Sequence, residues 1–310
     1  MTPLTANDIV GNWATLLLPL NADDSLDYGL LEAELDYFVA SRVNGIYSNG
    51  SAGEFYTQSE EEFDRVSALL AKTSEGSGTP FQIGACHMSP QLSRERIRRT
   101  KALRPGAFQI ILPDWFSPTF EEIVSFLEIM AAEAHPVPLV LYNPGHAKRR
   151  LDPVEWKAVA DRFPEIVGIK VPGGDEAWYT AMTPVMNKVS VFIPGHTLAA
   201  GFARGASGAY SNVACLSPTG AQSWYDLCLK DPAAGSALEK RIQAFWNANV
   251  APLITELKLP NMAADKAAAA AGGWLPGFSP RLRWPYKSAS LEKCAELRLA
   301  AQRALPEFFD

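Results

Sequence analysis

The sequence has few cysteines, and their spacing excludes the common uses of paired thiols. Four of the 310 residues are cysteine, scattered at Cys86, Cys215, Cys228 and Cys294. They form no Cys-x-x-Cys pair and no zinc-like spacing. We therefore expect reduced, mostly buried thiols rather than a disulfide framework.

Long apolar runs and an excess of basic residues are also missing. No apolar run reaches the roughly 18 residues of a membrane helix, and residues 1–12 have neither a basic start nor an apolar signal core. The 28 basic and 34 acidic residues give a net charge of −6, whereas nucleic-acid binding needs a basic face. We expect a cytoplasmic protein with neither a membrane nor a nucleic acid as partner.

What the sequence does contain is an alternation of short apolar segments with helical patterns. Both faces of most segments are apolar, as in strands of a covered parallel sheet. Eight such strands are predicted, at residues 13–20, 43–49, 80–86, 107–112, 138–142, 166–171, 189–193 and 208–213. Helices between them begin with capping patterns at Ser59, Thr119 and Asp152.

Eight strand–helix repeats predict an α/β fold that closes into a (β/α)8 TIM barrel. The alternative is an open doubly wound sheet, but no Gly-x-Gly-x-x-Gly follows the first strand. We expect the barrel domain to span residues 1–230. Residues 231–310 have no clear strand and predict a C-terminal helical region, with helices at 235–249, 263–271 and 290–305.

Lys170 is the most informative residue for function, because it stands between Ile169 and Val171 inside an apolar strand. Lysine is rarely buried, since removing an ammonium from water is unfavourable. Such surroundings lower its pKa and leave a neutral amine that can attack a ketone. The alternative is a lysine just past the strand end that pairs with a carboxylate.

Other chemical groups also follow predicted strands, where barrel enzymes place their sites. Tyr142 could shuttle protons near Lys170, or simply pack with a satisfied hydroxyl. The turn at residues 50–54, Gly-Ser-Ala-Gly-Glu, could bind a carboxylate through backbone amides, or be a plain turn.

Three histidines lie at predicted strand ends on the same rim. His87, His146 or His196 could act as a general acid or base, and His196 is the preferred candidate. Together they could also hold zinc. The His-x-His and His-x-x-x-His pairs of metallohydrolase barrels do not occur, so we predict no metal and no cofactor.

In their order and places, these segments resemble the dihydrodipicolinate synthase and N-acetylneuraminate lyase family over nearly the whole chain. The 50–54 turn resembles the family's pyruvate-carboxylate loop, Tyr142-Asn143 its Tyr-Asn strand end, and residues 167–170 its Schiff-base strand. The resemblance implies a pyruvate-type 2-keto acid substrate, no metal, and a homo-oligomer, either tetramer or dimer.

The chain also departs from the family pattern on the side of the second substrate. Ala52 replaces the loop's second hydroxyl, and Trp115 stands where the synthase lends a tyrosine across a subunit interface. Ala147 occupies the position of the arginine that binds the aldehyde's carboxylate. Tyr210 falls where an aliphatic residue covers the keto acid, so Trp115 and Tyr210 either make the pocket more aromatic or pack against the rim.

We therefore predict a Schiff-base lyase, an aldolase or dehydratase, that does not itself make dihydrodipicolinate. Lys170 is the expected nucleophile and Tyr142 the proton shuttle. The expected substrate-binding residues are Ser51, Ala52, Gly53, Trp115, Gly195, His196 and Tyr210, with Gly195 leaving room for the carboxylate. The alternatives are a hydratase-aldolase acting on aromatic pyruvate adducts, a barrel that binds a keto acid without turnover, and a metal-dependent hydrolase.

Overall fold

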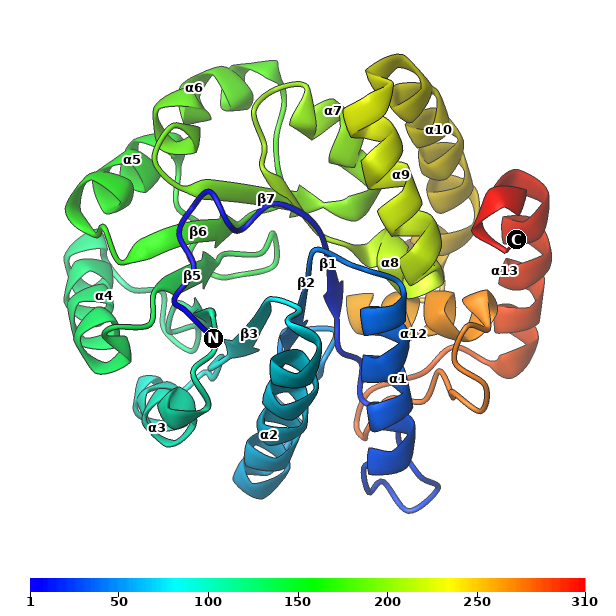
Figure 1. Cartoon of the computed structure of the whole chain (residues 1–310), viewed down its shortest axis with the longest axis horizontal. Coiled ribbons are helices and arrows are strands. Elements are labelled where there is room, and N and C mark those ends of the chain that lie inside the picture. Colours follow the sequence, from blue (N-terminus) through cyan, green and yellow to red (C-terminus); the bar gives the residue numbers. More distant parts are fainter. Residues whose placement is uncertain (310) are drawn as a thin grey trace.

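Eight parallel strands close into a barrel in the order β1 to β8 (Figure 1). The computed structural model describes residues 1–309. The strands are β1 Gly11–Thr15, β2 Gly45–Ser48, β3 Phe81–Gly84, β4 Ala107–Ile111, β5 Leu139–Tyr142, β6 Ile166–Lys170, β7 Ser190–Pro194 and β8 Gly208–Tyr210. The predicted (β/α)8 TIM barrel with C-terminal helices is confirmed.

Most strands end earlier than the apolar patterns predict, and after β1 and β8 a side chain accepts a hydrogen bond from the backbone that follows. Ser211 caps helix α8, Asn212–Leu216, through a bond from Ala214 N–H to its hydroxyl, so β8 stops at Tyr210. After β1, the N–H of Leu17 donates to a Glu34 carboxylate oxygen at 2.8 Å. Apolar runs therefore continue past the sheet into the loops at the barrel mouth.

Helices surround the barrel, and each of the capping patterns noted in the sequence is present. The side chains of Ser59, Thr119 and Asp152 form capping boxes. The helices of this outer layer are α1 Tyr28–Ala40, α2 Glu60–Ser77, α3 Pro90–Thr100, α4 Phe120–Ala134, α5 Pro153–Arg162, α6 Glu176–Met186, α7 Leu198–Phe202 and α9 Pro218–Lys230.

The chain after α9 is helical, as predicted. It forms α10 Pro232–Phe245, a π-helical turn Trp246–Val250, α11 Ala251–Thr255, α12 Asn261–Gly272 and α13 Leu291–Ala304. The alanine-rich α12 packs between α8 and α13 (Figure 1). Small side chains permit this close approach, since a Cβ on Gly272 would lie 1.9 Å from the Leu216 carbonyl oxygen.

One buried lysine ties α12 to the C-terminal end of the barrel strands. Lys266 Nζ donates to the carbonyl oxygens of Leu18 and Arg281 at 2.6 and 2.7 Å. It also pairs with Glu54 at 2.5 Å, and both side chains are almost fully buried. Helix α12 is thereby held over the barrel mouth.

The state of the cysteines and the character of the helices both bear on the predictions made from the sequence. All four cysteines are free and buried. Within residues 1–309, no helix combines the length and apolar character needed to cross a bilayer.

Candidate active site

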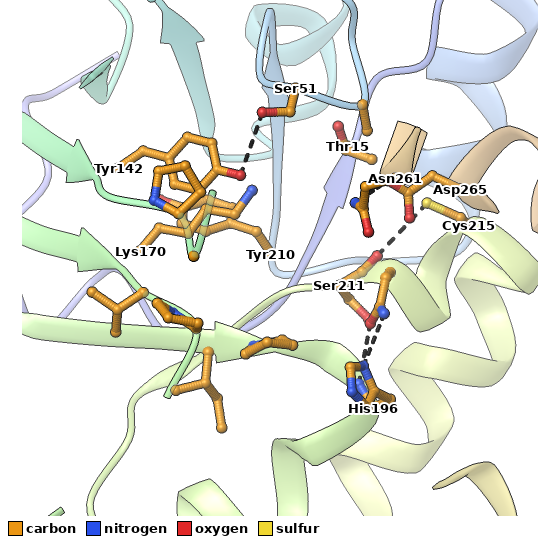
Figure 2. Close-up of a pocket in the computed structure, with 18 of the residues that line it drawn as sticks. Thr15, Ser51, Tyr142, Lys170, His196, Tyr210, Ser211, Cys215, Asn261 and Asp265 are labelled. Atoms are coloured by element: carbon orange, nitrogen blue, oxygen red, sulfur yellow. Dashed lines mark hydrogen bonds between the residues drawn. The ribbon is translucent and has the colours of Figure 1, made fainter. Parts of the chain in front are cut away.

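A cavity of about 230 Å³ opens at the C-terminal ends of the strands. Figure 2 shows Lys170 and Tyr142 entering it on one side, and Asn261 and Asp265 of α12 entering on the other. The cavity is lined by Thr15, Tyr47, Ser51, Ala52, Tyr142, Pro144, Gly145, His146, Lys170, Val171, Pro172, Ile193, Pro194, His196, Tyr210, Ser211, Asn212, Cys215, Asn261 and Asp265.

Lys170 ends β6 and points into this cavity among three tyrosines. Its Nζ donates to the Tyr47 hydroxyl at 3.1 Å and lies 4.8, 4.2 and 5.1 Å from the ring centres of Tyr47, Tyr142 and Tyr210. Burial lowers the pKa of the Lys170 ammonium from its ordinary 10.5 to about 8, although the charge of Asp265 opposes this shift. A free amine is therefore accessible near neutral pH.

Tyr142 lies beside Lys170 because β5 and β6 pair with these two residues in register. The Ser51 hydroxyl donates to the Tyr142 Oη at 3.3 Å, as Figure 2 shows. Burial raises the pKa of the Tyr142 phenol to about 12, so the group keeps its proton at neutral pH. It can donate that proton to an oxygen forming at the lysine.

Some residues of the turn after β2 line the cavity and others do not. Ser51 and Ala52 line it, whereas Gly53 lies behind them. A Cβ on Gly53 would lie 3.0 Å from the Leu16 carbonyl oxygen and 3.1 Å from the Asn49 nitrogen. This glycine therefore allows the close packing that shapes the turn.

His196 and Gly195 follow β7 and lie against α8. The His196 Nδ1 and Asn212 Nδ2 are 2.9 Å apart, and the imidazole stacks on Trp246 with ring centres 5.7 Å apart. Burial lowers the pKa of His196, which favours its neutral form. Gly195 is buried, and a Cβ there would lie 2.4 Å from the Ser211 hydroxyl oxygen.

The two aromatic residues that depart from the family pattern have different surroundings. Tyr210 lines the cavity with its ring, while its hydroxyl donates to the Gln82 side-chain oxygen at 2.6 Å. Trp115 lies outside the cavity, with 71% of its surface exposed, and Lys148 Nζ lies 5.0 Å from the centre of its ring. Of these two residues, Tyr210 alone lines the cavity that holds Lys170.

The three rim histidines are not brought together. His146 and His196 line the cavity, whereas His87 is outside it and accepts a bond from the Ser89 N–H at 2.9 Å. Across residues 1–309, no group of three or more His, Cys, Asp or Glu side chains has the arrangement of a metal site.

Several cavity residues were not expected from sequence. Tyr47 lies in β2 and its hydroxyl accepts a hydrogen bond from Lys170. Its place in the sequence, three residues before the turn that begins at Gly50, was the one indication that it could reach the site. Asp265 was not considered because it does not follow a strand. The sequence indication was that it is the one acidic residue in an alanine-rich helix. The others are Thr15, Cys215 and Asn261.

A second, larger cavity of about 590 Å³ adjoins the first. The two share Ser51, Tyr142, Pro144, His146 and Asn261. The remaining walls are mostly apolar and consist of Phe55, Tyr56, Met88, Ile111, Leu112, Asp114, Asn143, Ala147, Ile254, Leu259, Pro260, Met262 and Tyr286. Asp114 is the one acidic side chain among its lining residues, which include no arginine or lysine.

The site can be compared with known proteins. Residues 8–304 match the model of the dihydrodipicolinate synthetase family. A 4-hydroxy-tetrahydrodipicolinate synthase from Flavobacterium psychrophilum is 27% identical over 167 residues, which are 54% of this chain and 56% of that protein. Across this and three further relatives, the match spans 52–62% of the relative's length.

Other similarities extend over nearly the whole chain. An N-acetylneuraminate lyase from Rhizobium meliloti is 28% identical over 306 residues, 95% of each protein. The crystal structure of an E. coli K12 prophage protein of the dihydrodipicolinic acid synthase family, in complex with pyruvate, has the same fold. It superposes with a TM-score of 0.85 at 20% identity, covering 96% of this chain and 98% of that one. The chain belongs to the dihydrodipicolinate synthetase family.

Proposed function

We propose that this protein is a lyase that joins Lys170 to a 2-keto acid as a Schiff base. The observation that carries the proposal is the Lys170 amine, which lies among three tyrosine rings in the cavity and has a pKa near 8. A neutral amine at the end of a barrel strand is a suitable nucleophile for a ketone. Membership of a family that includes N-acetylneuraminate lyase supports the same reaction class.

The residues around Lys170 suit the steps of imine formation. Its nitrogen attacks the keto carbon, and the carbonyl oxygen takes a proton from the Tyr142 hydroxyl to give a carbinolamine. The nitrogen of this adduct returns a proton to the Tyr142 phenolate. Tyr142 then protonates the leaving hydroxyl, and loss of water gives an iminium ion. Ser51 holds Tyr142 in place through its hydrogen bond, and the turn that contains Ser51 and Ala52 offers backbone amides to the substrate carboxylate.

The iminium ion withdraws electrons from the carbon next to it, which permits aldol cleavage, aldol addition or dehydration. We propose that the second substrate is not the one used for dihydrodipicolinate synthesis. Ala52 and Ala147 carry no hydroxyl or guanidinium at the two matching positions, and no arginine lines either cavity.

A second candidate function, a hydratase-aldolase for aromatic pyruvate adducts, is favoured by the larger cavity. That cavity adjoins Tyr142 and is walled mainly by aliphatic and aromatic side chains, which suit an apolar partner better than a polyhydroxylated sugar. With pyruvate as donor, we expect benzaldehyde-type aldehydes to be consumed at least tenfold faster than short sugar aldehydes. A preference for sugar aldehydes, measured by product chromatography, would assign the protein to the sugar-acid branch.

The test of Schiff-base formation is reductive trapping of the wild-type protein. Incubation with pyruvate and borohydride is expected to add one reduced pyruvyl group per chain, and peptide mapping should place it on Lys170. Lactate, which has no keto group, serves as the control and should add nothing. Trapping of neither pyruvate nor any longer 2-keto acid would refute the proposal, and an adduct without turnover of any partner would indicate a binding protein.

We include a homo-oligomeric assembly and a cytoplasmic location in this proposal. Trp115 and Phe116 expose 71% and 81% of their surfaces beside each other, and exposed neighbouring aromatics are typical of protein contacts. Four free thiols suit a reducing compartment.

A further inference from the structure

We propose that the Asp265 carboxylate is the base that removes, and later returns, a proton at C3 of the keto acid bound to Lys170. This inference rests on the proposed Schiff-base function. It concerns a residue of α12, not of the barrel strands, and it assigns to that residue a step distinct from the one proposed for Tyr142.

Asp265 has the position of a residue that contacts the substrate. Its side chain lines the same cavity as Lys170, and Figure 2 shows it facing the cavity from the opposite side. Only 7% of the residue is exposed. A ligand joined to Lys170 would therefore lie between the lysine and this carboxyl group.

A purely structural role does not explain Asp265. Its one side-chain hydrogen bond comes from the Asn261 amide at 3.5 Å, the long limit for such a bond. The adjacent Lys266 points elsewhere and pairs with Glu54. Buried carboxyl groups usually have close hydrogen-bond or ionic partners, because burial without them is unfavourable. Asp265 is thus a buried acid whose free side is the substrate cavity.

The different acidities of Asp265 and Tyr142 divide the proton transfers between them. Burial raises the pKa of Asp265 to about 7, against the opposing effect of the Lys170 charge, whereas the pKa of Tyr142 is about 12. At pH 7, about half of the Asp265 groups but only on the order of one Tyr142 in 10⁵ would be ionised. A base works best when its pKa is near the working pH, so the carboxylate suits proton abstraction and the phenol suits proton donation.

The step balances without any further reactant. The Asp265 carboxylate takes a proton from C3 of the iminium ion, and the C3–H electron pair becomes the C2–C3 double bond. The electron pair of the C2–N double bond moves to nitrogen, which gives a neutral enamine and a protonated Asp265. Return of that proton to C3 restores the iminium ion, and in heavy water a deuteron can return instead.

Deuterium exchange of pyruvate tests this step without knowledge of the second substrate. The wild-type protein in heavy water is expected to remove the methyl proton signal of pyruvate. Asp265→Asn should still form the borohydride-reduced adduct, while its exchange rate per adduct falls by about 10²–10⁴-fold. Asp265→Ala should behave likewise, and added formate should restore part of its exchange by occupying the vacated position.

Tyr142→Phe is the matched comparison, because it removes the hydroxyl proposed to protonate the carbonyl oxygen at Lys170. It should form the adduct more slowly yet retain exchange per adduct. The proposal is overturned if Asp265→Asn exchanges at the wild-type rate, if Tyr142→Phe alone loses exchange per adduct, or if both Asp265 variants lose the adduct itself. Failure of the wild-type protein to form an adduct would instead reject the Schiff-base function on which the inference rests.

Discussion

Lys170→Ala is expected to abolish the reduced pyruvate adduct and to lower turnover by about 10⁴–10⁶-fold, the range seen when a covalent nucleophile is removed. The cavity offers no substitute, since Lys170 is the only lysine that lines it. Alanine also removes the charge that sits among Tyr47, Tyr142 and Tyr210, so loss of function should not require loss of folding. Intact mass spectrometry after borohydride reduction measures the adduct, and circular dichroism checks the fold.

Lys148→Ala provides the control for this experiment. Lys148 is exposed near Trp115 and lies outside the cavity that holds Lys170. The variant should be trapped with pyruvate as fully as the wild type. An adduct that persists in Lys170→Ala at the wild-type level would show that another amine reacts, and the assignment of Lys170 would be wrong.

Lys266→Met is expected to lower the free energy of unfolding by about 3–5 kcal/mol, because it leaves a buried charge without its partner. In the native structure Lys266 is fully buried, pairs with Glu54 and donates to two carbonyl oxygens. Methionine is one atom shorter than lysine, fills most of the same space and supplies none of these bonds. The Glu54 carboxylate would then remain buried, with the backbone N–H of Arg283 donating a hydrogen bond to it at 3.2 Å.

Urea denaturation followed by circular dichroism measures this change. Lys157→Met is the control, because Lys157 pairs with Asp161 at an exposed site where ion pairs contribute little, and its midpoint should stay near that of the wild type. The double variant Lys266→Met/Glu54→Gln should recover part of the loss by removing the unpaired carboxylate. A Lys266→Met midpoint equal to that of Lys157→Met would refute a stabilising role for this pair.

The sequence predicted the barrel because its evidence is local and repeated. Apolar segments, capping residues such as Ser59 and Thr119, and their alternation all depend on neighbouring positions in the chain. The same holds for Lys170 and Tyr142, which stand at strand ends. Parallel pairing of consecutive strands in a barrel places those ends at one rim, and the register of β5 with β6 brings the two residues side by side.

Strand ends were less predictable, since they depend on side chains from elsewhere. Nothing near Leu17 in the sequence shows that its N–H is taken by Glu34 of α1. The local signal for the end of β8 was present in Ser211, although the predicted strand extended to Val213. At β1 and β8, side chains that bond to the following backbone mark where the strand stops.

The sequence by itself determined the fold, the lysine at the end of β6 and the residues that depart from the family pattern. Only the tertiary structure decided which of the candidates share a cavity. It placed Trp115 on the exposed surface and His87 outside the site, and it brought Tyr47 and Asp265 into the cavity that holds Lys170. The physical reason is that α12 packs over the barrel mouth through Lys266 and small alanines, contacts between segments more than 200 residues apart that no local pattern records.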